Sequence, residues 1–245
     1  MSAFSKTIES FWKKPYLSGE IVCQNDQLIV SINPDLDEDR RVMMLDTGAQ
    51  VLVVMTPAVA GQLGLSAQEA LTEATLRQRL GEANIALHGA DYIFHFTEAD
   101  KARLLQEANP ANVRQLTEHD EAAFAEFQAS ASEQDLDDAY VELDHWAVFG
   151  AFDDERLIAA TSMYPWDDGP QAEPIADTGV LTLPPFRGKG HARAVVRAIS
   201  RHACQLGYEP QYRCQTDNQA STLLAKSAGL TLYGKWEVVS PDADE

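Results

Sequence analysis

The sequence predicts an α/β protein made of two parts, a smaller domain over residues 1–110 and a second domain over residues 111–245. Three observations predict this class. Strand-like apolar runs alternate with helical patterns in both halves, two strand patterns in the second half are spaced as a hairpin, and a glycine-rich turn joins a strand to a helix. The dipeptide Asn109-Pro110 is typical of a loop and marks the boundary.

The sequence of the first part predicts a mixture of short strands and helices. Apolar runs predict strands over 27–32, 41–44, 51–55 and 91–96, and helical spacing predicts helices over 57–63 and 66–80. One segment, Asp46-Thr47-Gly48, resembles the catalytic turn of retroviral-type aspartic proteases, but the chain turns helical soon after it. A turn between two strands is the simpler interpretation, because Asp and Gly suit tight turns.

The second part predicts a longer series of elements. The strand patterns 146–152 and 156–164 are separated by Asp153-Asp154-Glu155, which is typical of a hairpin. The other predicted strands cover 113–116, 180–183, 211–216 and 230–236, and the predicted helices cover 121–128, 191–206 and 219–228.

The turn between Leu183 and Ala192 is the strongest functional signal in the sequence. Pro184 and Pro185 end the strand because proline has no N–H to donate, and the glycines at 188 and 190 allow a tight turn without side chains. The helix that follows presents N–H groups without an intrahelical partner, which predicts an anion-binding site suited to a diphosphate. The glycine spacing matches neither an ATP-binding P-loop nor a dinucleotide-binding fingerprint.

This turn resembles the acyl-CoA loop of the GNAT superfamily of N-acyltransferases, whose pattern is Arg/Gln-x-x-Gly-x-Gly/Ala. Arg187, Gly190 and Ala192 fill that pattern, and the segment that begins with Asn218 and Ser221 is similar to the second motif of the family. The order of strands and helices fits as well. The resemblance implies a GNAT-like mixed, mostly antiparallel sheet flanked by helices. The first part is then either a degenerate GNAT-like half or a family-specific substrate domain.

The resemblance implies an N-acyltransferase that moves an acetyl or short acyl group from acyl-CoA, with acetyl-CoA as the expected donor, to a primary amine by direct attack. A non-catalytic acyl-CoA-binding regulatory module is the alternative. Basic side chains near the turn are suited to CoA phosphates. The residues expected to bind acyl-CoA are Leu181, Thr182, Leu183, Arg187, Gly188, Lys189, Gly190, His191, Ala192, Arg193, Asn218 and Ser221.

The residues that move protons are assigned by their position. In the family a carboxylate or an ordered water commonly accepts the proton of the amine, and Asp177, ahead of Glu173, is the catalytic candidate on the strand before the turn. Many members place a tyrosine seven residues after the motif asparagine as proton donor to the thiolate, and here that position is Ala225. Tyr164 or Tyr233 can substitute from a strand, Ser221 can act through water, or the thiolate can leave without help.

The composition excludes several classes of partner. The net charge of −19 repels nucleic acid and anionic membrane surfaces and attracts amines, whether of a metabolite, an antibiotic, a peptide or a protein lysine. Solubility, or a salt-adapted host, is the simpler explanation of so acidic a chain. The apolar stretches are well short of the ~20 residues of a membrane helix, and the N-terminus lacks the pattern of a secretion signal. Three widely spaced cysteines suit reduced thiols, so we expect a cytoplasmic protein without a metal site. A homodimer is one candidate assembly.

Overall fold

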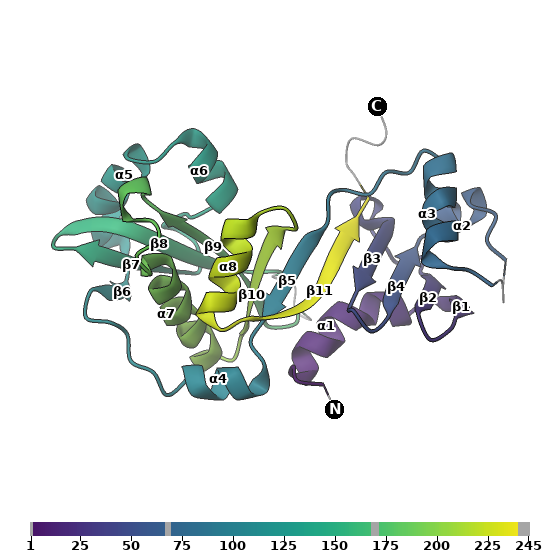
Figure 1. Cartoon of the computed structure of the whole chain (residues 1–245), viewed down its shortest axis with the longest axis horizontal. Coiled ribbons are helices and arrows are strands. Elements are labelled where there is room, and N and C mark those ends of the chain that lie inside the picture. Colours follow the sequence, from purple (N-terminus) through teal and green to yellow (C-terminus); the bar gives the residue numbers. More distant parts are fainter. Residues whose placement is uncertain (1, 67–69, 168–171, 240–245) are drawn as a thin grey trace. The chain divides into compact units, whose positions relative to one another are not determined.

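The computed structural model describes residues 2–66, 70–167 and 172–239 of the chain (Figure 1). Its contacts define two compact units. Unit 1 comprises Met1–Ile8, Phe94–Arg213 and Gln219–Leu232, and unit 2 comprises Glu9–Ile93, Cys214–Asn218 and Tyr233–Glu245. The chain passes between the units more than once, because β5 (Asp91–His95) and β11 (Thr231–Val238) carry residues of both. None of the described helices is long and apolar enough to span a membrane.

Unit 2 is built on a sheet with a buried apolar face. Its strands, in spatial order, are β1 (Glu20–Gln24), β2 (Leu28–Ile32), β4 (Val51–Met55), β3 (Val42–Asp46) and β11. The neighbours β2 and β4 are parallel, whereas the other pairs among these strands are antiparallel. Val30, Val42 and Val53 from three of these strands lie in one core, so the apolar runs of the first half fold onto each other.

Two helices cover this core, α2 (Pro57–Gln62) and α3 (Glu73–Glu82). The helix expected from residue 66 is described only from Glu73, because the Thr72 hydroxyl accepts a hydrogen bond from the Thr75 N–H and caps the helix there. Leu76 and Leu80 are its buried residues. Residues 67–69 of the predicted helix lie outside the described residues.

The Asp46-Thr47-Gly48 segment forms the turn between β3 and β4, as the simpler interpretation predicts. The Asp46 carboxylate accepts a hydrogen bond from the Gly48 N–H at 2.7 Å, and Thr47 Oγ1 donates to the Gln50 carbonyl at 2.9 Å. These side chains therefore complete the hydrogen bonding of the turn itself.

Helix α1 (Lys6–Leu17) and strand β1 were not predicted from the sequence. Pro15 lies inside α1, and a proline in a helical pattern usually indicates a break. The part of α1 that belongs to unit 2 is stabilised by burial, since Trp12 is 4% exposed and its ring lies 5.7 Å from that of Trp236. Tertiary packing thus outweighs the weak local signal.

Unit 1 is built on another part of the same sheet. Its strands, in spatial order, are β10 (Glu209–Gln215), β9 (Ile175–Thr182), β8 (Arg156–Pro165), β7 (Ala147–Asp153) and β6 (Val113–Gln115). β9 and β10 are parallel, and the other pairs among these strands are antiparallel. The predicted class, α/β with a mostly antiparallel sheet, is therefore confirmed, and so is the hairpin of β7 and β8.

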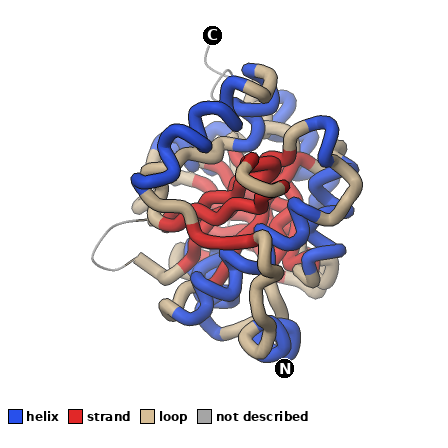
Figure 2. Tube along the Cα trace, turned by 90° about the vertical axis from the view of Figure 1, so that its left-hand side faces the viewer, coloured by secondary structure: helices blue, strands red, loops and turns tan. Residues whose placement is uncertain are grey.

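Helices cover both faces of the sheet of unit 1 (Figure 2). α7 (His191–Gln205) packs Val195 and Ile199 into the core on one face, and α5 (Glu121–Ala129) packs Phe124 and Phe127 into the core on the other. Helix α6 (Glu133–Ala139) was not predicted from the sequence. The other helices of this unit are α4 (Glu98–Leu104) and α8 (Gln219–Ala228).

Leu76→Ala is expected to lower the free energy of unfolding by about 2–5 kcal/mol, because the fully buried side chain leaves a cavity in unit 2. Leu223→Ala is the matched control, since Leu223 is 67% exposed and its loss should change stability by less than about 0.5 kcal/mol. Urea unfolding followed by tryptophan fluorescence compares the two variants. Equal effects would contradict a packed core around α3.

Candidate functional site

The strands β9 and β10 separate part of the way along their length. Their parallel pairing covers Ile175 to Asp177 on β9 and Glu209 to Gln211 on β10. β9 continues to Thr182, and its pairing with β8 continues with it. Residues 178–182 therefore have a paired strand on one side only, and their backbone groups on the other side form an open edge.

The alternation of an antiparallel pair shows which residues face this open edge. The Leu183 N–H donates to the Ile158 carbonyl at 3.0 Å, so Leu183, and Leu181 before it, direct their backbone groups toward β8. The backbone groups of Thr178 and Val180 then point away from β8. The open edge consequently presents Thr178 and Val180, which the sequence did not single out, together with the predicted Thr182, rather than Leu181 and Leu183.

The turn after β9 has the geometry of an anion-binding site. Gly188 and Gly190 have φ values of 74° and 87°, and a Cβ at either position would meet no atom within 4 Å. The Ala194 N–H donates to the Gly190 carbonyl, so the amides of residues 191–193 precede the hydrogen-bonded part of α7. The turn thus offers open space beside helix N–H groups.

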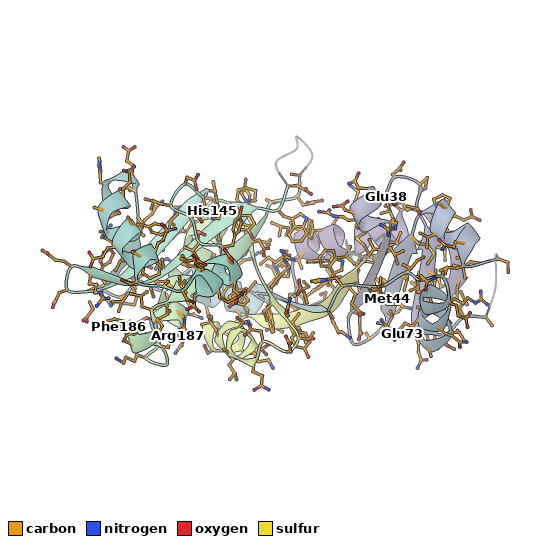
Figure 3. All side chains as sticks on the ribbon, turned by 90° about the horizontal axis from the view of Figure 1, so that it is seen from above. Glu38, Met44, Glu73, His145, Phe186 and Arg187 are labelled. Carbon is orange, nitrogen blue, oxygen red and sulfur yellow. The ribbon has the colours of Figure 1, made fainter. Side chains whose placement is uncertain are left out.

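Arg187 connects this turn to its surroundings (Figure 3). Its guanidinium donates to the Thr182 carbonyl at 2.9 Å and pairs with Asp135 of α6 at 2.7 Å. Lys189 Nζ lies 5.3 Å from the centre of the Phe186 ring. Positive charge is therefore gathered at the turn although the whole chain is acidic.

The arginines on one face of α7 have different roles. Arg197 Nε donates to Glu107 at 2.9 Å, and Arg201 donates to Asn109 Oδ1 at 2.7 Å. These two side chains hold the linker between α4 and β6, which contains Glu107 and Asn109, against α7. Arg193 is exposed, and it lines a cavity of about 300 Å³ between this linker and the start of α7.

Thr182 carries a buried hydroxyl that has no hydrogen-bond partner among the described residues. Its side chain is 9% exposed, and a buried polar group without a partner costs free energy. Thr182 alternates with Leu181, which packs on the α5 side, so Thr182 faces the α7 side where the turn begins. A ligand at the turn could satisfy this hydroxyl.

Asp177 lies where β9 and β10 begin to separate, and its side chain is 3% exposed. Its Oδ2 accepts a hydrogen bond from Arg213 Nε at 2.9 Å, and its Oδ1 accepts one from Gln211 Nε2 at 3.4 Å. Asp177 also begins a second Asp-Thr-Gly segment in the chain. This segment lies within a strand, and its carboxylate is paired with an arginine, unlike the carboxylate pair of an aspartic protease.

Tyr164 lies opposite Asp177 in the pairing of β8 with β9. Burial, followed by the negative charge of Asp177, raises the pKa of Tyr164 to about 12. Its hydroxyl is therefore protonated at neutral pH and suited to donate a proton. Tyr233 belongs to unit 2, and Ala225, at the usual tyrosine position, is fully buried on α8.

The remaining predicted residues lie at the ends of elements. Asn218 directly precedes α8 and donates its N–H to the Gln215 carbonyl at 3.0 Å, and Ser221 lies in the first turn of α8. His191 begins α7, and its ring lies 6.4 Å from that of Phe186. The structure thus brings the residues of the turn together, whereas Asn218 falls in unit 2.

A cluster of three rings was not predicted from the sequence. His145 lies in the loop between α6 and β7, and its ring centre is 4.9 Å from those of both Tyr140 and Tyr164 (Figure 3). Its Nδ1 is 2.8 Å from the Ser162 hydroxyl oxygen on β8. The sequence offers little signal for this cluster, because its members come from separate elements.

The match to a family model agrees with this geometry. Residues 113–230 match the model of the acetyltransferase (GNAT) family. No curated protein matched the sequence. The family match supports acyl transfer as the general kind of chemistry.

Solved structures of low sequence identity are similar to parts of this chain, and one of them reaches a TM-score of 0.50. An acetyltransferase of the GNAT family from Colwellia psychrerythraea has a TM-score of 0.50 and 20% identity, over 77% of this chain and 76% of that one. A GNAT-family protein from Novosphingobium aromaticivorans has a TM-score of 0.48 and 16% identity, over 63% of this chain and 65% of that one, slightly less than two thirds of its length. A conserved protein of unknown function from Staphylococcus epidermidis has a TM-score of 0.45 and 11% identity, over 94% of this chain and 96% of that one.

Asp177→Asn is expected to destabilise the protein by about 1–3 kcal/mol, because it removes the charged acceptor that Arg213 binds at a buried position. Asp167→Asn is the control, since Asp167 is exposed and its substitution should cost less than about 0.5 kcal/mol. Thermal unfolding measures both. An unchanged melting temperature for Asp177→Asn would contradict the ion pair at the separation of the strands.

Proposed function

We propose that this chain, whose residues 113–230 form a GNAT-family acetyltransferase domain, transfers an acetyl or short acyl group from acyl-CoA to a primary amine. One observation carries the proposal: the open edge of β9 leads directly into the glycine turn and the first amides of α7. A ligand with an extended amide-containing arm and an anionic end matches this order of backbone groups, and acyl-CoA has that construction.

Acyl-CoA supplies an activated acyl group when it is bound, and the part of the protein is to bind and orient it. The backbone groups of Thr178 and Val180 are proposed to pair with the amides of the pantetheine arm. The amides of residues 191–193 are proposed to bind the diphosphate, with Lys189 and Arg193 supplying charge. The other residues predicted from the sequence, among them Asn218 and Ser221, stay predictions.

Acyl transfer to an amine also needs a proton donor for the departing thiolate and a proton acceptor for the amine. Tyr164 is proposed as the donor, because its hydroxyl stays protonated at neutral pH and faces the region of Asp177. Asp177 is the acceptor predicted from the sequence. Its two oxygens already accept hydrogen bonds from Arg213 and Gln211, so they are less available to accept the proton of the amine.

The second candidate function is a non-catalytic acyl-CoA-binding regulatory module. Ala225 favours it, because the position that commonly carries the tyrosine donor has no hydroxyl and is buried. In either case residues 111–245 are proposed as the domain that binds acyl-CoA and residues 1–110 as an accessory α/β domain, although residues 94–110 belong to unit 1 by their contacts. Release of CoA thiol in the presence of an amine distinguishes the two functions, because only the enzyme consumes acyl-CoA.

Acetyl-CoA is expected to raise the melting temperature, because a ligand that binds only the native state adds RT ln(1 + [L]/Kd) to its stability. At about 100-fold over Kd the gain is ~2.7 kcal/mol. Gly190→Asp should abolish the shift, since the side chain enters the open space of the turn and its charge opposes a diphosphate. Scanning fluorimetry measures each shift.

Gly207→Asp is the matched control for this experiment. Gly207 also has a positive φ, 86°, and no atom within 4 Å of an added Cβ, but it follows the opposite end of α7. Its variant should therefore keep the acetyl-CoA shift while bearing a similar backbone strain. A normal shift in Gly190→Asp would contradict the proposed diphosphate site.

Release of CoA thiol from acetyl-CoA is expected in the presence of a primary amine. The measurement uses a thiol reagent and a panel of metabolite, antibiotic, peptide and protein-lysine amines at neutral pH. Gly190→Asp provides the background rate. Binding of acetyl-CoA without thiol release across the whole panel would favour the regulatory module over the enzyme.

A further inference from the structure

The loop between α6 and β7 is fixed on β9 by close packing. Tyr140 has φ 45° and ψ 52°, a left-handed conformation that is uncommon for a bulky residue. A Cβ on Gly179 would lie 2.3 Å from the Ala139 carbonyl oxygen and 2.8 Å from that of Tyr140, so only glycine at this position of β9 lets the loop lie there. Such enforced backbone conformations are concentrated at functional sites.

A hydrogen bond to Ser162 orients the ring of His145 in this loop. The buried Ser162 hydroxyl donates to the Tyr140 carbonyl at 3.4 Å, and its oxygen lies 2.8 Å from His145 Nδ1. When the hydroxyl hydrogen is used in this bond, Nδ1 carries a hydrogen and donates it to Ser162 Oγ. Nε2 of His145 then carries the free lone pair, which makes it a proton acceptor.

The register of β8 and β9 places His145 close to the open edge. Ser162 is paired with Gly179, and Tyr164 is paired with Asp177. His145 contacts both Ser162 and Tyr164, so it lies over β8 on the face that also carries Asp177. Neighbouring strands are about 4.8 Å apart, which brings His145 within roughly one strand spacing of β9.

Burial favours the neutral form of the His145 ring. Burial lowers the pKa of His145, and the negative charges of Asp144 and Glu142 offset this effect only in part. From α6 and β8 it faces the rings of Tyr140 and Tyr164. The imidazole is therefore uncharged at pH 7 and able to accept a proton, whereas the oxygens of Asp177 are already engaged.

We propose that His145 is the proton acceptor for the substrate amine, an inference that rests on the proposed function. As the amine nitrogen forms a bond to the acyl carbon and the carbon–sulfur bond breaks, His145 Nε2 takes a proton from the nitrogen and Tyr164 gives one to the sulfur. The proton on His145 then returns to Tyr164 through solvent, so one thioester and one amine give one thiol and one amide. Ser162 is the positioning residue that orients the ring.

Imidazole nitrogen NMR on the full-length protein labelled with ¹⁵N-histidine tests the first half of this inference without substrate. We expect the His145 signal to show the Nδ1–H tautomer at pH 7 and to protonate below pH 6.5, the ordinary histidine value. His145→Gln identifies the signal by its loss, and Ser162→Ala should remove the tautomer preference. A charged ring at pH 7, or the Nε2–H tautomer, would overturn the proposal.

Thiol release from acetyl-CoA tests the second half with an amine that the wild type uses. His145→Gln is expected to lower kcat by about 10²–10⁴-fold while leaving the heat shift by acetyl-CoA unchanged. His119→Gln is the matched control, because His119 is exposed elsewhere in unit 1 and should leave both quantities unchanged. Equal turnover in His145→Gln and the wild type would overturn the inference alone.

The pH dependence distinguishes His145 from Asp177. The ratio of wild-type to His145→Gln turnover should fall as the pH drops through the pKa of His145, since the wild-type base is then protonated, and ionisation of the amine cancels in this ratio. If Asp177→Asn abolishes the pH dependence and His145→Gln keeps it, the proposal is wrong. If the wild type binds acetyl-CoA but releases no thiol with any amine, the proposed function fails and the inference fails with it.

Discussion

The end of the pairing between β9 and β10 after Asp177 is the constraint on which the rest of the site depends. Before this point each strand satisfies the backbone groups of the other. Beyond it the backbone groups on one side of β9 need another partner, and water or a ligand can supply it. The ion pair between Asp177 and Arg213 holds the two strands together where they begin to separate, so it fixes where the open edge starts.

Two glycines allow other backbone segments to approach the open edge of β9. One is Gly179 on β9 itself, and the other is Gly190 before α7. Gly179 leaves room for the loop after α6, which carries His145 over β8. Gly190 takes a positive φ that lets α7 begin with its amides beside open space. Both positions exclude a side chain, the first through steric overlap and the second through conformation. The proposed ligand site is consequently made largely of backbone, with side chains at its margins.

The charges of the chain are distributed so that the proposed amine meets a negative field and the phosphates of acyl-CoA meet a positive one. The chain as a whole carries −19, which attracts an amine, whereas Lys189 and Arg193 gather beside the α7 amides, which favour a phosphate. Arg197 and Arg201, on the same helix face, are used by the linker before β6. The arginines that repeat along α7 therefore have two roles: Arg193 is available to a ligand, whereas Arg197 and Arg201 stabilise the fold.

The sequence by itself determined the elements whose signals are local: the strand Val51–Met55, the helix Gln219–Ala228 and the turn in which prolines and glycines join β9 to α7. It missed α1, where burial of Trp12 compensates for an internal proline. Only the tertiary structure decided that Asp177 is bound by Arg213 and that His145 meets Ser162. These contacts join residues 36 and 17 positions apart, and such distances in sequence leave no periodic pattern, because folding alone brings the partners together.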